Sequence, residues 1–302
     1  MRGERGWHLI EIGSFRARDG TRIACYEAGP RDGVPLVLCG GLGGGMRVWH
    51  ALLEHVAPRF RILAWDYRGL YASGKPRRAA LELRDHVADL LALLRHKRVE
   101  QPVLVGWSMG VQVALEVHRT HPELPRALVG LFGTAGRVLD TAFDSPLSAR
   151  VVPGVLRVLR SVGTSFQSLG PRLARAPGFA SGFVRAARSA GLMAPGIDVE
   201  AFRDIAEAWT RLDLALYAHH FEALFRHDAW DLLPDIRTPS LLVAGGRDRF
   251  TPPHLAERMA KTLPDAHFEL LPEATHFGLI EEPDEIADAI ARFAEERLGI
   301  PA

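Results

Sequence analysis

The sequence predicts an α/β protein, with a mostly parallel sheet, helices on both faces and an inserted helical cap. Three observations support this fold class. Short apolar runs bounded by turn residues recur along the chain, helical patterns lie between them, and the alternation stops over one long internal segment. Alternating strands and helices favour a parallel sheet that is covered on both faces.

Seven runs are predicted as strands because each is short, rich in apolar or β-branched residues and bounded by turn residues. They are residues 22–27, 35–39, 61–64, 103–106, 127–132, 241–244 and 267–271. Helical spacing of apolar residues follows several of them, as in residues 81–94. Pro253 and Pro283 occupy positions typical of the first turn of a helix.

The alternation stops between Gly133 and Asp231, where the pattern becomes helical and Gly-Pro pairs divide the segment into short helices. We predict that residues 134–231 form a helical cap, and that residues 1–133 and 232–302 form the core domain. The apolar residues of the predicted cap include Phe166, Leu169, Phe179, Phe183, Trp209, Leu212 and Leu216.

The composition argues against several classes of partner. The 302 residues hold 37 Lys+Arg and 36 Asp+Glu, so the formal charge of +1 gives no broad field to attract nucleic acid or an anionic membrane. No apolar run approaches the roughly 20 residues that span a bilayer, and residues 1–10 lack the apolar centre of a signal peptide. We therefore expect a cytoplasmic protein that binds a small molecule. The sequence does not indicate an oligomeric state.

The strongest chemical signal is Gly106-Trp107-Ser108-Met109-Gly110, which lies between a predicted strand and a predicted helix. A nucleophilic serine on a sharp strand-to-helix turn needs small residues two before and two after it, because the backbone there is strained and closely packed. A chance match in a chain with 29 glycines would not supply the flanking strand and helix. Ser108 is therefore predicted as a catalytic nucleophile.

Two downstream residues are predicted to activate this serine. A serine hydroxyl needs an adjacent base, and the base needs a third group that holds it in the right tautomer. Asp248 follows the predicted strand 241–244, and His276 follows the predicted strand 267–271, so both are expected at the carboxyl edge of the sheet. The order Ser108, Asp248, His276 is the one expected of a triad on such a sheet.

The glycine run at residues 40–45 is predicted to supply part of an oxyanion hole, which stabilises negative charge on a carbonyl oxygen. The expected donors are the backbone N–H groups of Leu42 and Met109. Gly41, Trp107 and Phe277 are predicted to contact the substrate, Trp107 as an apolar wall, although a buried packing role for Trp107 is an equal alternative.

No cofactor and no metal ion is predicted. His-Glu-x-x-His and paired Cys-x-x-Cys spacings are absent, and Cys25 and Cys39 lie in apolar runs where free thiols act as small apolar groups. The glycine run lacks the Gly-Lys-Ser/Thr of a phosphate loop, and Met46 stands where a dinucleotide fingerprint needs a small residue. Asp66, after the next strand, keeps the dinucleotide alternative open.

Together these motifs resemble the α/β-hydrolase superfamily, and specifically its capped esterase and haloperoxidase-like branch, over about residues 21–298. Asp66-Tyr67-Arg68-Gly69, with Ser73-Gly74 beyond it, is similar to the family's Asp-x-Arg-Gly turn. The resemblance implies an eight-stranded sheet, a cap between the sixth and seventh strands and an acyl-enzyme mechanism. Departures from the family pattern occur at residues 40–41, 71, 107 and 111, and none removes a triad group.

The predicted function is hydrolysis of a small or medium apolar carboxylic ester, or a related acyl compound, through an acyl-enzyme. An acyltransferase, or a perhydrolase or haloperoxidase, would use the same triad and stays open as an alternative. A receptor that only binds a small molecule is an alternative of another class, although binding alone has no need of all three triad groups.

Overall fold

The computed structural model describes residues 10–42, 44–76, 81–142, 178–189 and 207–300, with single residues between 154 and 205. Its centre is an eight-stranded sheet with the order β1-β2-β4-β3-β5-β6-β7-β8. The strands are β1 (Glu11–Arg16), β2 (Arg22–Ala28), β3 (Val34–Cys39), β4 (Phe60–Trp65), β5 (Val103–Trp107), β6 (Ala127–Leu131), β7 (Ser240–Gly245) and β8 (Ala266–Leu271). Strands from β4 to β8 in this order pair in parallel, whereas β2 is antiparallel to both of its neighbours. The predicted fold class, with a mostly parallel eight-stranded sheet, is confirmed.

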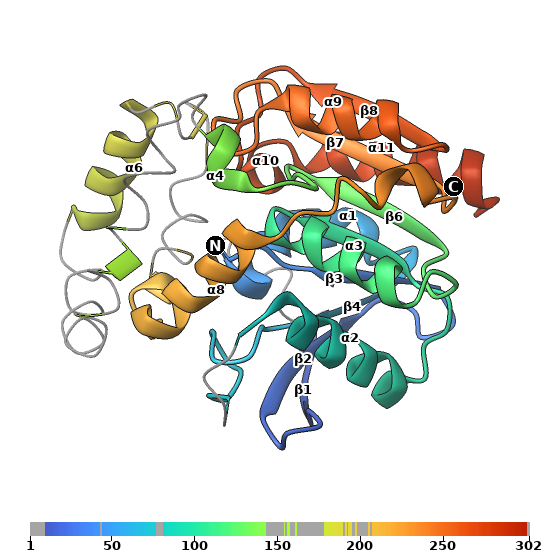
Figure 1. The fold of residues 1–302 in the computed structure, drawn as a ribbon, viewed down its shortest axis with the longest axis horizontal. Helices are drawn as coiled ribbons and strands as arrows, with labels where there is room; N and C mark the ends of the chain where they lie inside the picture. The colour runs from blue at the N-terminus through green and yellow to red at the C-terminus, as the bar shows by residue number, and fades with distance from the viewer. Residues whose placement is uncertain are drawn as a thin grey trace.

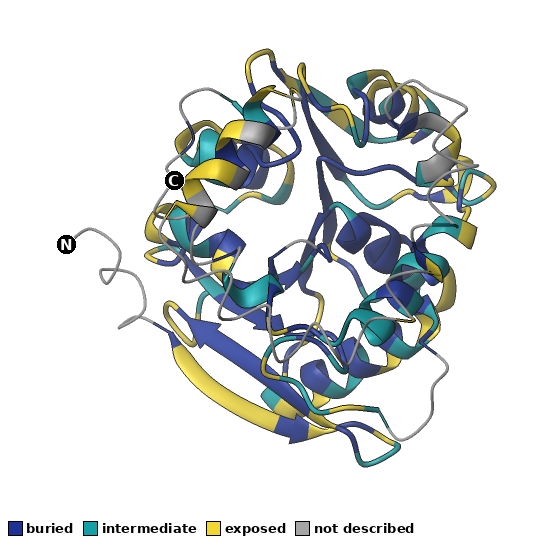
Figure 2. Cartoon of the chain, turned by 90° about the vertical axis from the view of Figure 1, so that its left-hand side faces the viewer, coloured by how far each residue is buried: buried dark blue, intermediate teal, exposed yellow. Residues whose placement is uncertain are grey.

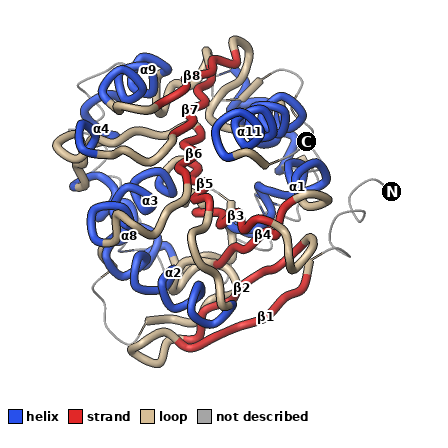
Figure 3. The backbone as a smooth tube through the Cα atoms, turned by 90° about the vertical axis from the view of Figure 1, so that its right-hand side faces the viewer, coloured by secondary structure: helices blue, strands red, loops and turns tan. Residues whose placement is uncertain are grey.

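Helices cover both faces of the sheet, and Figure 3 shows α1 and α11 on one face and α2, α3 and α9 on the other. The helical elements are η2 (Gly45–Trp49), α1 (His50–Val56), α2 (Leu83–Lys97), α3 (Met109–Thr120), α4 (Val138–Thr141), α6 (Phe179–Ser189), α8 (Leu214–Arg226), η4 (Leu233–Asp235), α9 (Pro253–Thr262), α10 (Gly278–Glu281) and α11 (Pro283–Leu298). Within the described residues, no helix is long and apolar enough to cross a bilayer.

The central strands are buried on both faces, which explains their continuous apolar runs. Side chains alternate along β5, so Val105 packs in the apolar cluster that includes Phe293 of α11, while Leu104 packs in the cluster that includes Leu90 of α2. Figure 2 shows these strands as buried through the middle of the molecule. The sheet therefore separates two apolar layers.

The edge strand β1 is the one strand that the apolar runs did not predict. Phe15 is its only buried residue, and Ile12 is 68% exposed. Figure 2 draws β1 as an exposed outer strand paired with the buried β2. An edge strand with one side chain in the core has no continuous apolar run to reveal it.

Helices α4, α6 and α8 lie beside one end of the sheet (Figure 1). All three belong to the segment predicted as the cap, and its extent stays a prediction. Ala229 N donates to Ala135 O at 2.8 Å, so this segment leaves and rejoins the core at neighbouring positions. Phe166 and Leu169 lie outside the described residues, as do the side chains of Phe179 and Phe183.

Candidate active site

Ser108 sits on a strained turn between β5 and α3. Its φ of 54° and ψ of −117° place it in a region that L-residues rarely adopt. A Cβ on Gly106 would lie 2.5 Å from the carbonyl carbon of Gly110, and a Cβ on Gly110 would lie 1.8 Å from Cys39 O. Only glycine fits at either position, so the close approach of strand and helix exposes the serine hydroxyl at the end of β5.

The three predicted triad residues form one chain of hydrogen bonds. His276 Nε2 lies 3.0 Å from Ser108 Oγ, and His276 Nδ1 lies 2.8 Å from Asp248 Oδ2. Both distances are within the range of good hydrogen bonds. Asp248 and His276 are buried, at 3% and 9% exposure, so water competes little for the bond between them.

Asp248 is held by its own loop. Its Oδ1 accepts from the backbone N–H of Phe250 at 2.8 Å and of Thr251 at 2.9 Å, while its Oδ2 accepts from the Thr251 hydroxyl at 2.7 Å. These donors fix the carboxylate plane and leave Oδ2 aimed at His276. Sequence reasoning did not single out Thr251, whose role depends on the loop conformation.

Glu281 fixes the loop that carries His276. Its Oε2 accepts from Thr275 N and its Oε1 accepts from the Thr275 hydroxyl, each at 2.8 Å. The same carboxylate accepts from Ala194 N at 2.8 Å, which ties a residue of the predicted cap to the histidine loop. Glu281 is a second residue that sequence reasoning missed.

The glycine loop packs directly against the nucleophile. A Cβ on Gly41 would lie 3.0 Å from Ser108 Cβ and 2.7 Å from the Trp107 ring, so residue 41 must be small. Leu42 follows it, and Met109 is the first residue of α3, where a backbone N–H has no partner within the helix. The two predicted oxyanion donors therefore belong to segments that meet at Ser108.

Trp107 and Phe277 both pack against His276, and their rings lie 6.3 Å from each other. The Trp107 indole donates to His276 O at 3.1 Å, and its ring lies 5.7 Å from the His276 ring. Trp107 is 1% exposed and Phe277 is 7% exposed, so both side chains are packed in the core. Their packing supports the histidine, and their contact with substrate stays a prediction.

Asp66 and Arg68 are buried and bonded to neighbouring segments, and Asp66 also lines a cavity beside the glycine loop. Asp66 Oδ2 accepts from the Tyr26 hydroxyl at 2.7 Å and from Ala72 N at 3.0 Å. Arg68 donates through Nε to Asp89 at 2.8 Å and forms a buried ion pair with it. Asp66 is thus bound to neighbouring loops, which does not fit the ribose-binding role that a dinucleotide site would require.

A buried histidine pair lies behind the glycine loop. His86 Nε2 of α2 lies 3.1 Å from His220 Nδ1 of α8, and His220 Nε2 lies 3.1 Å from Arg68 O. Burial lowers the pKa of His220 to about 4 and also lowers that of His86, so both rings are neutral near pH 7. The pair joins α8 to the core by polar contacts that the sequence did not indicate.

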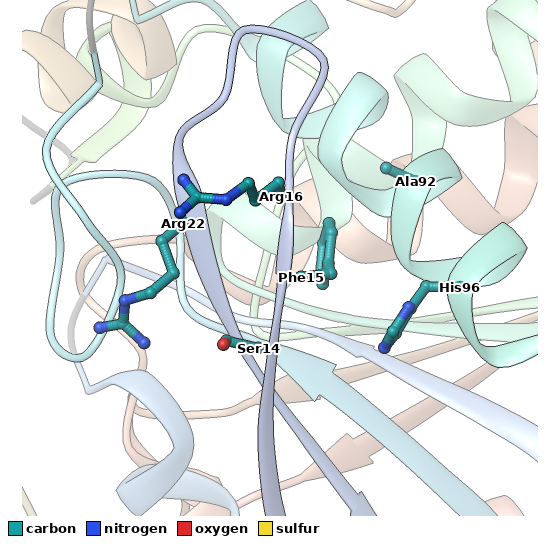
Figure 4. A pocket seen from close by; sticks show the side chains of 6 residues that line it. All are labelled: Ser14, Phe15, Arg16, Arg22, Ala92 and His96. Carbon is teal, nitrogen blue, oxygen red and sulfur yellow. The ribbon is translucent and has the colours of Figure 1, made fainter.

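Two cavities lie at different places in the molecule, and no triad residue lines either of them. One, of about 410 Å³, lies on the edge of the sheet between β1, β2 and α2; its lining includes Phe15, Arg22 and His96, and none of the triad (Figure 4). The other, of about 330 Å³, adjoins the glycine loop and is lined by Met46, Tyr71, Arg211 and Leu212 among others. Because the glycine loop beside it packs on Ser108, the second cavity is the candidate for holding part of a substrate.

Within the described residues, no group of three or more His, Cys, Asp or Glu side chains could hold a metal ion. Cys25 and Cys39 are buried free thiols. Burial raises the pKa of both thiols, which disfavours the reactive thiolate. The predicted role of both cysteines as small apolar groups fits this environment.

The sheet topology and the strand-serine-helix turn are those of an α/β-hydrolase. The chain belongs to the alpha/beta hydrolase family, whose family model matches residues 36–289. The predicted resemblance to this superfamily is confirmed, and the chain is an enzyme of the hydrolase class.

Three similar proteins illustrate the range of the family. A pimeloyl-[acyl-carrier protein] methyl ester esterase from Yersinia pseudotuberculosis is 25% identical over 273 residues, which cover 90% of this chain and 96% of the relative. "Putative non-heme bromoperoxidase BpoC" from Mycobacterium tuberculosis is 26% identical over 268 residues, which cover 86% and 94%. A thermophilic esterase from Thermogutta terrifontis has a solved structure with a TM-score of 0.70 and 23% identity, covering 95% of this chain and 98% of that chain. The last likeness is one of fold.

Proposed function

We propose that the protein cleaves a small or medium apolar carboxylic ester, or a related acyl compound, through an acyl-enzyme on Ser108. The observation that carries the proposal is the chain of hydrogen bonds from Ser108 Oγ through His276 to Asp248. A serine, a base and an orienting carboxylate in this arrangement are the parts of nucleophilic acyl transfer.

In the first half of the reaction, Ser108 Oγ attacks the carbonyl carbon and His276 Nε2 takes the hydroxyl proton. The carbonyl oxygen becomes an oxyanion, which accepts from the N–H groups of Leu42 and Met109. His276 then gives its proton to the leaving alcohol oxygen as the carbon–oxygen bond breaks. Asp248 stabilises the imidazolium between these two proton transfers and keeps its own charge.

In the second half, water replaces the alcohol. His276 takes a proton from the water, the resulting hydroxide attacks the acyl carbon, and the tetrahedral intermediate collapses to release the acid and restore the Ser108 hydroxyl. No redox partner is needed, so atoms and protons balance within the triad and the two substrates.

Apolar surroundings favour an apolar substrate. The Phe250 ring lies 5.1 Å from the His276 ring, and the Phe277 ring lies 6.1 Å from it. We also propose that residues 134–231 form a cap over this site, since α4, α6 and α8 lie at the end of the sheet from which the chain departs after β6. Burying apolar groups there contributes about 25 cal/mol for each Å².

A second acceptor is the alternative that the bromoperoxidase relative favours. Hydrogen peroxide in place of water would attack the same acyl-enzyme and release a peracid, with the same proton transfers at His276. The observation that favours this alternative is the similarity to a relative named as a bromoperoxidase. The triad geometry is equally suited to both acceptors, so the measured product decides between them.

The test combines labelling and turnover. A fluorophosphonate probe should add once per chain, and Ser108→Ala should abolish labelling while thermal unfolding stays cooperative. A panel of p-nitrophenyl esters of increasing acyl length, with and without hydrogen peroxide, should give sustained turnover. Labelling that survives Ser108→Ala would overturn the nucleophile, and labelling without turnover on any ester would favour a binding role.

A further inference from the structure

Two tyrosines hold the glycine loop by its carbonyl oxygens. The Tyr67 hydroxyl donates to Gly40 O at 2.6 Å, and the Tyr71 hydroxyl donates to Leu42 O at 2.9 Å. Both tyrosines come from the turn after β4, and both side chains reach across to the loop that follows β3. The two bonds therefore join two loops that are separate in the sequence.

The positions of these bonds matter because of what lies between them. Gly40 O belongs to the peptide that joins residues 40 and 41, and Leu42 O belongs to the peptide after Leu42. The peptide between residues 41 and 42 carries the Leu42 N–H, and it is flanked on each side by a peptide whose carbonyl is held. Fixing both flanking planes restricts rotation of the middle one, because neighbouring peptide planes share only two soft dihedrals per residue.

We propose that Tyr67 and Tyr71 are positioning residues that hold the Leu42 N–H in place for the oxyanion. This inference rests on the proposed function, and it concerns the same site. Neither tyrosine touches the reacting atoms; each acts through the backbone of the glycine loop.

The turn holds the Tyr71 backbone in a conformation that tyrosine rarely adopts. Its φ of 47° lies in the left-handed region, which a tyrosine occupies only at an energetic cost. A Cβ on Gly45, in the same glycine-rich segment, would lie 2.8 Å from the Tyr71 ring. The ring is thus packed closely on the loop whose carbonyl it binds.

Both hydroxyls stay protonated in the working range of a hydrolase. Burial raises the pKa of Tyr67 and of Tyr71 well above the usual value, so each remains a donor. The Trp209 side chain, which hydrogen-bonds to Tyr71 and opposes this rise, has the indole N–H as its only polar group. Tyr71 therefore accepts from Trp209, in the predicted cap, and donates to Leu42.

The Tyr67 ring packs against two other aromatic rings. Its ring lies 4.3 Å from the His86 ring and 5.6 Å from the Trp65 ring, and His86 is bonded to His220 of α8. The two tyrosines thus connect the oxyanion loop to two parts of the predicted cap, the Trp209 side chain and α8.

The experiment replaces only the hydroxyls. Tyr67→Phe and Tyr71→Phe remove one donor each and keep the rings. Tyr217→Phe removes a hydroxyl from a tyrosine that lies near Tyr71 and packs on Phe221 but makes no hydrogen bond to Gly40 O or Leu42 O. For each variant we would measure kcat and KM with p-nitrophenyl acetate, the rate constant of fluorophosphonate inactivation, and Tm.

We expect Tyr67→Phe and Tyr71→Phe each to lower kcat by roughly 10-fold to 100-fold, less than the 10²- to 10³-fold that follows loss of an oxyanion donor. KM should change little, because the lost interaction acts in the transition state. Fluorophosphonate inactivation should slow in parallel, and Tyr217→Phe should match the wild type.

Trp209→Phe supplies a further test, and as a single variant it does not depend on the folding of either tyrosine variant. It should lower kcat with the same signature, and Trp209→Phe combined with Tyr71→Phe should be no slower than Tyr71→Phe alone, because the tryptophan acts through the tyrosine hydroxyl.

Two outcomes would overturn the inference while leaving the proposed function intact. The first is kcat in the Tyr67→Phe and Tyr71→Phe variants equal to that of Tyr217→Phe. The second is a fall in kcat that merely follows a fall in Tm, with inactivation rates unchanged. A wild-type protein that neither turns over esters nor reacts with the probe would overturn both proposals.

Discussion

The Thr251 hydroxyl donates to the same carboxylate oxygen, Asp248 Oδ2, that accepts from His276 Nδ1. Thr251 Oγ also lies 3.3 Å from His276 Nδ1, so the hydroxyl, the imidazole and the carboxylate are each within hydrogen-bonding distance of the other two. The threonine therefore limits how far the carboxylate can rotate away from the histidine.

Thr251→Val tests this relationship because valine keeps the shape and removes the hydroxyl. We expect kcat to fall by about 10-fold, equivalent to about 1.4 kcal/mol, since the two backbone donors to Asp248 Oδ1 remain. Steady-state kinetics on p-nitrophenyl acetate would measure the effect. An unchanged kcat in a folded variant would mean that the backbone donors suffice.

Asp248→Asn should reduce turnover by up to about 10⁴-fold, because the amide would no longer hold the imidazole in its working tautomer. Asp66→Asn is the matched control, since Asp66 is equally buried but bonded to Tyr26 and Ala72 rather than to the histidine. Its effect should appear in Tm far more than in kcat. Equal losses of kcat in two well-folded variants would contradict the assignment of Asp248.

Asp66 should also make stability depend on pH in acid. Burial raises its pKa to about 6, against 3.8 for an ordinary carboxyl, despite opposing hydrogen bonds from Tyr26 and Ala72. Between these values the folded state binds more protons than the unfolded state, so the Asp66 contribution to stability is full below about pH 4 and is lost as pH rises through about 6. The shift corresponds to at most about 3 kcal/mol.

Asp66→Asn removes this titration. Thermal unfolding between pH 4 and pH 7 should therefore show the wild-type Tm falling relative to that of the variant as pH rises. Two curves that stay parallel across this range would show that Asp66 does not carry the linkage.

Gly110→Ala and Gly182→Ala should have opposite effects on stability. A Cβ at residue 110 would lie 1.8 Å from Cys39 O, so α3 must move off the sheet and the turn at Ser108 is lost with it. Gly182 lies within α6 with nothing within 4 Å of an added Cβ, and alanine there should stabilise by about 0.5–1 kcal/mol. Chemical denaturation of both variants would measure this, and a stable, active Gly110→Ala would refute the packing argument.

Leu212→Ala should change the preferred ester length. Leu212 is buried and lines the 330 Å³ cavity beside the glycine loop, so removing its isobutyl group enlarges the space for a longer acyl or alcohol chain. Leu263→Ala is the control, because Leu263 is buried at the C-terminal end of α9 and should cost a similar 2–5 kcal/mol without altering preference. The same chain-length profile in both variants would place specificity elsewhere.

The sequence was informative where function depends on local pattern. Ser108 and the glycines around it are recognisable because one tight turn imposes all of their constraints. Asp248 follows the buried strand β7, and His276 follows the edge strand β8, of which only Leu271 is buried. Their place at the carboxyl edge of the sheet could be read from these two strands. The apolar runs found every strand of the parallel sheet for the same reason.

What escaped prediction depends on contacts between distant segments. Tyr67 and Tyr71 find their acceptors about thirty residues away, at Gly40 and Leu42, and a tyrosine in a turn carries no mark of its partner. Glu281 lies on the short helix α10 and accepts from Thr275 in the loop before it, and no repeating pattern in the sequence marks this contact. The edge strand β1 escaped because only one of its side chains enters the core.

The hydrogen bond from Ala229 N to Ala135 O has an evolutionary consequence. Because the chain leaves the core and returns to it at neighbouring positions, the segment between these two residues can be lengthened, shortened or replaced. No strand end has to move, so the strands that carry Ser108, Asp248 and His276 keep their places if contacts such as that of Ala194 N with Glu281 are kept. A lineage can in this way acquire new substrates by trading one segment while inheriting its chemistry unaltered.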